Sequence, residues 1–201
     1  MKKWLSIGLL ALGLSLFGHG VYMQAKAWLA QVLIEQAWQT ALKSPNKKIK
    51  PWFYADSYPV AQIIWPKHNK RLTVLDGASG RNLAFAPSHF LPAGELGGAD
   101  FGNSQGALIA GHNDTHFAFL KNAKVGEQFS LQLKNGQVQH YSVTHVEVIN
   151  QYNTDFLQQS GLYLLTCYPF DSLASGTDLR WLVSAEISSP EVALGISTTS
   201  S

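Results

Sequence analysis

From about Pro51 onward the chain is a succession of short β-rich runs separated by Gly, Pro, Asn and Asp residues. Few helical patterns accompany these runs, so they favour an antiparallel sandwich or a closed barrel. The runs around 107–110 and 162–165 have few polar positions, so both faces of these strands are expected to be covered, and closure is the better prediction. Seven runs are predicted as strands: 60–65, 71–75, 106–111, 128–133, 138–148, 161–166 and 179–184, with 185–187 as an extension.

Two connections between the runs stand out. Asn135-Gly136 lies between the alternating run 128–133 and the run 138–148, which is a strong short-range pattern for a β-hairpin. Residues Arg81 to Asp100 are rich in Gly, Pro and small side chains, and they predict a long irregular connection of the kind that often carries function.

The first residues of the chain have a different character. Lys2 and Lys3 precede an uncharged, mostly apolar stretch from Trp4 to about Met23. At about 1.5 Å per residue this stretch is long enough to cross a hydrocarbon core of about 30 Å. We therefore expect residues 1–23 to be a transmembrane anchor, although Ala25-Lys26-Ala27 would also suit a cleavable signal peptide. The two lysines favour a cytoplasmic N-terminus, with the remaining chain outside the cytoplasm.

Residues 24–50 are predicted to form a short amphipathic helix and a linker. Apolar residues recur at helical spacing, namely Trp28, Leu29, Val32, Leu33, Ala37 and Trp38. A helix on a membrane surface or a partner is one interpretation, and a stalk that packs on the domain is the favoured one. Pro45 and Pro51 end the helix. The domain is then expected to span 51–188, and the Ser/Thr-rich residues 189–201 to be a flexible tail.

Composition excludes several classes of protein. A chain of 201 residues suits one domain with a short appendage. The formal charge of +2, with 15 Lys and Arg against 13 Asp and Glu, is too small and dispersed for a nucleic-acid surface.

Cys167 is the only cysteine of the chain and ends the run 161–166. A lone thiol outside the cytoplasm cannot form an intramolecular disulfide and is exposed to oxidation, so its presence calls for a reason. Nucleophilic catalysis is one such reason. The ordinary alternative is that the thiol serves as a small buried hydrophobe.

A cysteine nucleophile requires a base or cation to supply thiolate, and donors for the oxyanion. His112 is the best-placed base, because it follows a glycine at the end of the buried run 106–111. Arg180 opens the strand that follows the cysteine and is the candidate oxyanion clamp. Ordinary roles remain open for both: a hydrogen-bonded strand-end histidine, and an arginine paired with Asp178 or Asp171.

Three motifs taken together resemble the sortase family. They are Gly111-His112 after a buried strand, Leu164-Leu165-Thr166-Cys167 at the end of another, and Arg180 thirteen residues later. The resemblance covers about Pro51 to Ile187 and includes the order His, Cys, Arg. The stretch 111–120 looks most like the class GN sortases of Gram-negative bacteria. Tyr163 stands where many sortases carry Thr, a departure outside the reacting groups.

The resemblance implies an all-β, closed eight-stranded barrel and a cysteine transpeptidase of the cell envelope. Such an enzyme cleaves a Leu-Pro-x-Thr-Gly-like motif in the C-terminal sorting signal of an exported protein. Cys167 would form a thioester acyl-enzyme, and His112 would protonate the leaving amine and deprotonate the incoming one. Arg180 would hold the carbonyl oxygen or oxyanion.

Three further residues are expected to support this site. Thr166 would add a hydroxyl or backbone contact to the substrate or oxyanion, and His116 and Asp114 are candidates for positions around the base. The enzyme would sit in the bacterial inner membrane by a single pass, with its catalytic domain on the periplasmic side. The amine acceptor remains unidentified.

No metal or cofactor is predicted. His112 and His116 would ligate a metal only in a helix and with a third ligand. Some sortases bind calcium through loop carboxylates, but Glu95 and Asp100 are the only acids in the long connection, too few to support a site.

Two other functions stay open. One is a non-sortase cysteine peptidase or an L,D-transpeptidase, although the latter pattern requires Ser-x-Gly-Cys, whereas Leu165-Thr166 precede Cys167 here. The other is a membrane-tethered barrel that binds without catalysis, in which Cys167 belongs to the core.

Overall fold

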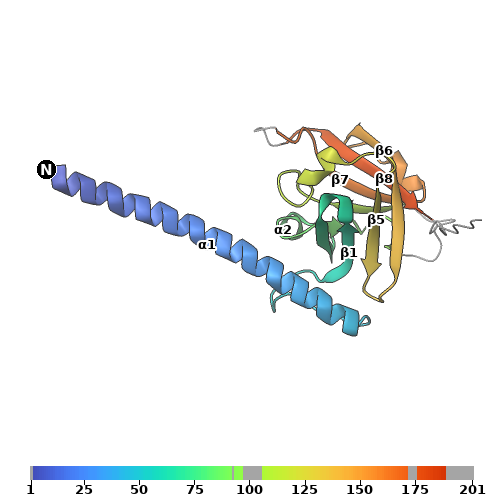
Figure 1. Cartoon of the computed structure of the whole chain (residues 1–201), viewed down its shortest axis with the longest axis horizontal. Coiled ribbons are helices and arrows are strands. Elements are labelled where there is room, and N and C mark those ends of the chain that lie inside the picture. The colour runs from blue at the N-terminus through green and yellow to red at the C-terminus, as the bar shows by residue number, and fades with distance from the viewer. Residues whose placement is uncertain (1, 92, 97–105, 172–175, 189–201) are drawn as a thin grey trace, which may run out of the picture.

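Eight strands close into a barrel, from which one long helix projects (Figure 1). This computed structural model describes residues 2–91, 93–96, 106–171 and 176–188. The strands are β1 (Pro59–Trp65), β2 (Lys70–Asp76), β3 (Ser88–His89), β4 (Ala107–Ala110), β5 (Gln128–Leu133), β6 (Val138–Asn150), β7 (Leu162–Cys167) and β8 (Leu179–Ile187). The α-helices are α1 (Lys2–Lys43) and α2 (Gly80–Leu83), and short 3-10 helices occupy Pro66–His68, Ala118–Asn122 and Asp155–Gln158.

Around the barrel the strands follow the order β1, β2, β3, β4, β7, β8, β6, β5. The pairs β2–β3 and β4–β7 are parallel, and the other neighbours are antiparallel. The closed eight-stranded barrel predicted from the sequence is therefore confirmed, as is the hairpin at Asn135-Gly136, which joins β5 to β6.

β3 is the strand that the sequence analysis missed. Its two residues lie inside the predicted irregular connection, and two residues are too few to show an alternating pattern. The strand nevertheless closes the barrel between β2 and β4. The far end of that connection, including Asp100, and the predicted tail 189–201 lie outside the described residues.

Alternate residues of the strands fill the barrel with a large apolar core. Three aromatic rings lie in its centre: Trp65 stacks on Phe129 at 4.5 Å between ring centroids, and Phe129 stacks on Tyr141 at 5.6 Å. A second cluster, which includes Leu108, Tyr163 and Leu182, lies on the opposite face of these strands. The strands β4, β7 and β8 are therefore covered on both faces, as predicted for β4 and β7.

The two helical segments predicted at the N-terminus form one continuous helix, α1. It is the one described helix that is long and apolar enough to cross a membrane, with a mean hydropathy of 1.3 over an 18-residue window. Its first half projects away from the barrel in Figure 1. The helix ends at Lys43, where Ser44 precedes Pro45 and is disfavoured in a helical conformation.

The second half of α1 packs on the barrel through one face. The buried side chains on this face are Ala30, Ile34, Ala37, Trp38 and Ala41. The predicted stalk that packs on the domain is therefore observed. The prediction was wrong in assigning Trp28 and Leu29 to the packed face, because their side chains are 69% and 49% exposed.

Polar contacts fix α1 against β1 and β2. The Glu35 carboxylate accepts hydrogen bonds from Gln62 Nε2 and Thr73 Oγ1, both at 3.1 Å. Nearer to the free half, Gln31 Nε2 donates to the Phe85 carbonyl at 2.6 Å. These contacts define both the axial position and the rotation of the helix, because each joins one particular turn of α1 to the barrel.

Truncation of a buried and of an exposed indole should show which face of the second half of α1 contributes to stability. Trp38 is fully buried, so Trp38→Ala leaves a cavity at the helix–barrel interface and is expected to lower the free energy of unfolding by about 3–5 kcal/mol. Trp28→Ala, at an exposed position, is the matched control and should change it by no more than about 0.5 kcal/mol. Urea unfolding of the full chain in detergent measures both, and equal losses would contradict the packing described.

Candidate active site

The ends of β4, β7 and β8 bring the three predicted catalytic residues to one level of the barrel. β4 and β7 pair in parallel from Ala107–Leu162 to Ala110–Leu165. The same register, extended by two residues beyond β4, would place His112 level with Cys167. On the other side of β7, Cys167 is the direct partner of Arg180 in β8. Three neighbouring segments therefore carry the three candidate residues, and we refer to His112, Cys167 and Arg180 as the candidate catalytic row.

Hydrogen bonds continue the β4–β7 pairing past the last residue of β4. The Gly111 N–H donates to the Leu165 carbonyl at 3.1 Å, and the buried Thr166 hydroxyl donates to the Gly111 carbonyl at 2.7 Å. Gly111, which precedes His112, is thus bound through both its N–H and its carbonyl to Leu165 and Thr166, which precede Cys167. This contact gives Thr166 a positioning function within the protein, while its predicted contact with substrate stays a prediction.

The thiol of Cys167 is exposed, because it alternates with the buried Thr166 along β7. An exposed thiol at a strand end is open to a substrate. The alternative in which Cys167 is a core residue of a binding module is therefore wrong.

Arg180 is held by neutral acceptors. Its guanidinium donates to the carbonyls of Thr177 and Leu179 and to Gln151 Oε1. Gln151 in turn donates to Asp178 Oδ1 at 2.6 Å, so Asp178 orients the amide instead of forming an ion pair with the arginine. No ion pair of Arg180 occurs within the described residues, which leaves its full charge available at the site.

Comparison with known proteins decides the family. The family model described as the sortase domain matches residues 63–188, which is more than half of the chain. The chain belongs to the sortase family. The comparison with curated protein sequences finds no match.

Solved sortases share the fold. A sortase D5 transpeptidase from Clostridium perfringens superposes with a TM-score of 0.59 at 16% identity, covering 80% of this chain and 96% of that chain. Sortase A from Corynebacterium diphtheriae gives a TM-score of 0.57 at 16% identity, covering 88% and 98%. Sortase C-1 from Actinomyces oris gives 0.54 at 22% identity, covering 78% and 99%. These neighbours belong to several sortase classes, so the class GN assignment stays a prediction.

Sortases are cysteine transpeptidases. In this sortase, a hydrogen bond joins the segments that follow β4 and β7. The Asn113 side-chain amide donates to the Pro169 carbonyl at 3.1 Å. Trp181 stacks on Tyr168 at 5.7 Å between ring centroids and donates from its indole N–H to the Leu120 carbonyl at 3.0 Å. The segments on both sides of the catalytic row are therefore tied to β8.

These supporting residues and Gln151 were not predicted from the sequence. Each lies in a connection or on a strand face where its residue type alone predicts nothing. The pairing of Gln151 with Arg180 follows from the β6–β8 register, in which Ile149 is opposite Arg180, and this register joins residues far apart in the chain.

Gly111 is required before the histidine. A Cβ at this position would lie 2.8 Å from the buried ring of Phe117, closer than real Cβ atoms approach a side chain. The Phe117 N–H donates to the His112 carbonyl at 2.9 Å and closes the turn that presents the imidazole. The glycine that precedes His112 is thus a packing requirement of this turn.

Of the two supporting residues predicted near the base, His116 is half-buried and Asp114 is exposed. Burial lowers the pKa of His116, and the neighbouring charges of His112 and Lys70 lower it further, against the opposing effect of Asp114. His116 is therefore held neutral near the base. It also lines a pocket of about 190 Å³ between α1 and the barrel, together with Gln31 and Glu35.

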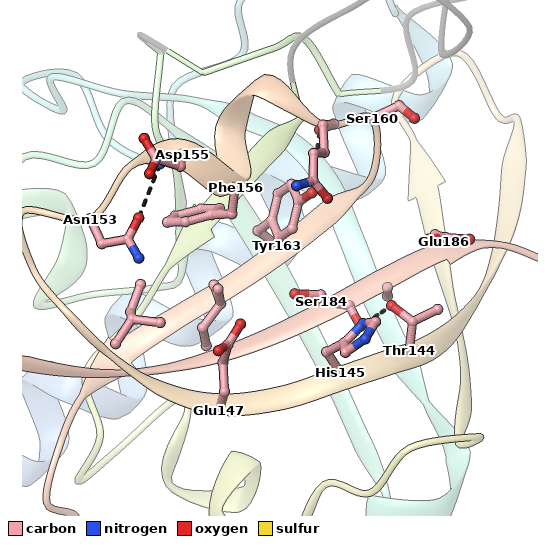
Figure 2. A pocket seen from close by; sticks show the side chains of 14 residues that line it. Thr144, His145, Glu147, Asn153, Asp155, Phe156, Ser160, Tyr163, Ser184 and Glu186 are labelled. Atoms are coloured by element: carbon pink, nitrogen blue, oxygen red, sulfur yellow. Dashed lines mark hydrogen bonds between the residues drawn. The ribbon is translucent and has the colours of Figure 1, made fainter.

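A second pocket, of about 310 Å³, lies between β6, β8 and the connection that follows β6 (Figure 2). His145 and Glu147 of β6, Ser184 and Glu186 of β8, and the connection that carries Asp155 surround it. None of the three predicted catalytic residues lines this pocket. Within the described residues no group of three or more His, Cys, Asp or Glu side chains is placed to hold a metal ion, and the use of calcium remains untested.

Loss of the Thr166 hydroxyl should destabilise the protein at the contact between β7 and the residue before His112. In Thr166→Val the buried Gly111 carbonyl loses its donor, which is expected to lower the free energy of unfolding by about 1–3 kcal/mol. Thr166→Ser keeps the hydroxyl and is the matched control. Chemical denaturation compares the three proteins, and equal stability of the Val and Ser variants would show that the contact contributes nothing.

The lowered pKa of His116 predicts a pH dependence of stability. Because the folded protein binds the proton more weakly than the unfolded chain, stability is complete above the ordinary histidine pKa of 6.5 and falls as the pH drops through it. His116→Gln should remove part of the fall between about pH 7 and pH 5. His145→Gln, at an exposed position, should leave the wild-type profile unchanged, and the profile is read from urea unfolding at each pH. A fall of the same size in both variants would contradict the account.

Proposed function

We propose that this sortase cleaves a Leu-Pro-x-Thr-Gly-like sorting motif of an exported protein and transfers the acyl fragment to an amine. The observation that carries the proposal is the row of His112, Cys167 and Arg180 across three neighbouring segments of a sortase barrel. The exposed thiol pairs directly with Arg180, and the β4–β7 register, extended by two residues, supports His112 as the base beside it.

Acylation uses the three residues in distinct roles. The Cys167 sulfur attacks the carbonyl carbon of the motif threonine, and a carbon–sulfur bond replaces the carbon–nitrogen bond of the scissile amide. His112 gives a proton to the leaving amine. The Arg180 guanidinium donates hydrogen bonds to the oxygen on which negative charge develops. Its neutral acceptors leave this charge uncompensated by any carboxylate contact in the described structure.

Deacylation reverses these roles. An incoming primary amine loses a proton to His112 and attacks the thioester carbonyl, and Cys167 leaves as a thiolate. The product is a new amide bond, and the enzyme returns to its starting state. If water reaches the thioester before the amine, the product is a free carboxylate and the enzyme acts as a peptidase.

The proposed location of the enzyme is the membrane. We infer that the apolar first half of α1 crosses the bacterial inner membrane once, with Lys2 and Lys3 on the cytoplasmic side and the barrel on the periplasmic side. A transpeptidase placed in this way meets exported proteins as they emerge. Its substrate would be an exported protein with a C-terminal sorting signal.

Substitution of the catalytic row should remove turnover of a soluble peptide that contains the motif. Cys167→Ala should abolish cleavage, because no other thiol exists in the chain. Arg180→Ala and His112→Ala should each lower kcat/KM by about 100-fold or more, since they remove an oxyanion donor and the general acid–base. The readout is a fluorogenic peptide with the full-length enzyme in detergent, with and without an added primary amine.

Arg81→Ala is the matched arginine control. Arg81 is an exposed arginine of α2 that is paired with Asp56 and does not belong to β4, β7 or β8, so its loss should leave kcat/KM within about twofold of wild type. Persisting cleavage by Cys167→Ala would contradict the proposal. Cleavage without amide formation in the presence of amine would assign the enzyme to peptidases instead of transpeptidases.

A further inference from the structure

A turn between α1 and β1 exposes two adjacent aromatic rings. Phe53 and Tyr54 are 91% and 67% exposed, and their rings meet edge to face at 4.8 Å between centroids. The Ala55 N–H donates to the Trp52 carbonyl at 3.0 Å and closes the turn. We call residues 52–55 the aromatic turn. Exposed rings that stand side by side, unlike scattered apolar side chains, mark an interaction surface.

Packing contacts place the aromatic turn beside the second, docked half of α1. Trp52 packs on the apolar cluster that includes Ile34 of α1, and its ring meets the ring of Phe85 at 5.1 Å between centroids. The Phe85 carbonyl accepts the hydrogen bond from Gln31. The chain after Lys43 therefore turns back along the helix (Figure 1), and the aromatic turn lies at the level of Gln31 and Ile34.

Two exposed tryptophans of α1 indicate the level of the bilayer. Trp4 and Trp28 are 78% and 69% exposed. They are 24 residues apart, which corresponds to about 36 Å along the helix axis. The hydrocarbon core is about 30 Å thick, and the bilayer with its headgroups is about 40–45 Å thick. Both indoles therefore fit in the headgroup layers, where tryptophan is enriched.

The same scale places the aromatic turn at the outer headgroup layer. Leu16 is the midpoint between the two indoles, and Gln31 lies 15 residues further on, or about 22 Å along the axis. The outer surface of the headgroups lies about 20–22 Å from the centre of the bilayer. The rings of Phe53 and Tyr54, at the level of Gln31, therefore reach this layer.

Basic side chains lie directly before the aromatic turn. Lys47, Lys48 and Lys50 are exposed. Asp56, which follows the turn, is paired with Arg81. Lysines are attracted to anionic headgroups, and aromatic rings favour the layer in which these headgroups lie. The surface therefore fits anionic phospholipid, and the apolar span of the same chain holds it beside the bilayer.

We propose that the aromatic turn and the lysines before it form a second membrane contact, in which the barrel rests on anionic headgroups beside α1. This inference rests on the proposed membrane location of the enzyme. A span and a separate surface contact together restrict the tilt of the barrel relative to the bilayer. The exposure of Trp28, which the barrel leaves uncovered, has its reason in the same headgroup layer.

Fluorescence quenching by lipids tests this contact in the full-length chain. Cys167→Ala removes the only thiol, and one new cysteine then carries an environment-sensitive fluorophore in each variant. Phe53→Cys and Tyr54→Cys report on the aromatic turn. Tyr152→Cys replaces an aromatic residue of the β6–β7 connection that is 77% exposed and is the matched control. The vesicles contain phosphatidylethanolamine, phosphatidylglycerol and a lipid with a spin label at its headgroup.

The labels at positions 53 and 54 should be quenched at least about threefold more strongly than the label at position 152, because the aromatic turn lies in the headgroup layer. Equal quenching at the three positions would overturn the second contact. Protection of the turn from aqueous iodide without quenching by lipid would overturn it too, and would assign the rings to a contact between copies of the chain.

Replacement of phosphatidylglycerol by phosphatidylcholine tests the role of the lysines. The neutral lipid should reduce the quenching at positions 53 and 54, because it removes the negative surface charge that attracts the lysines. Unchanged quenching would overturn the preference for anionic lipid.

A label in the middle of the span separates this inference from the proposed location. Leu16→Cys should be quenched by a lipid with a spin label deep in its acyl chain. If it is not, the proposed location and the second contact both fail. If it is quenched and the aromatic turn is not, the span stands and the second contact is wrong. Quenching requires no turnover, so cleavage of the soluble motif peptide by wild-type enzyme tests the proposed chemistry independently.

Discussion

The parallel pairing of β4 with β7 is the constraint on which the remaining structure depends. It determines which residue of one strand end stands beside which residue of the other, and a slip of one residue would turn every side chain to the opposite face. With the observed register, Cys167 is exposed and Thr166 is buried, and an extension of this register by two residues would place His112 level with the thiol. The hydrogen bond from Thr166 to Gly111 extends this register to the site itself. The β7–β8 pairing then adds Arg180 without further adjustment.

The electrostatic environment follows from this placement. Arg180 rests on carbonyls and an amide, so the strongest positive charge near the thiol is not neutralised by a contacting carboxylate. Burial lowers the pKa of half-buried His116, so its surroundings favour the neutral form of this imidazole. The candidate site therefore combines an arginine without a contacting carboxylate, a histidine and an exposed thiol, the combination that the proposed acyl transfer through a thioester requires.

The sequence predicted the strands and the catalytic row better than the contacts that support them. Alternating and continuous apolar runs are local patterns, so β5, β6, β7 and β8 were predicted close to their observed bounds. Pairing between distant strands leaves no local pattern, so Gln151 and Trp181 could not be recognised. The packed face of α1 was predicted incorrectly at Trp28 and Leu29, because apolar residues of the membrane-spanning half continue into the docked half and blur the helical periodicity.

The most direct test of this account measures whether the register brings the base beside the thiol. Residues level on neighbouring strands lie about 4.8 Å apart, within the range that a disulfide spans. Under mild oxidation, the new thiol in His112→Cys should form an intramolecular disulfide with Cys167, detected by mass spectrometry of proteolytic fragments. Asp114→Cys, two residues further along the same connection, is the control and should remain reduced. No bridge in His112→Cys, or equal bridging in both variants, would contradict the register and the catalytic row built on it.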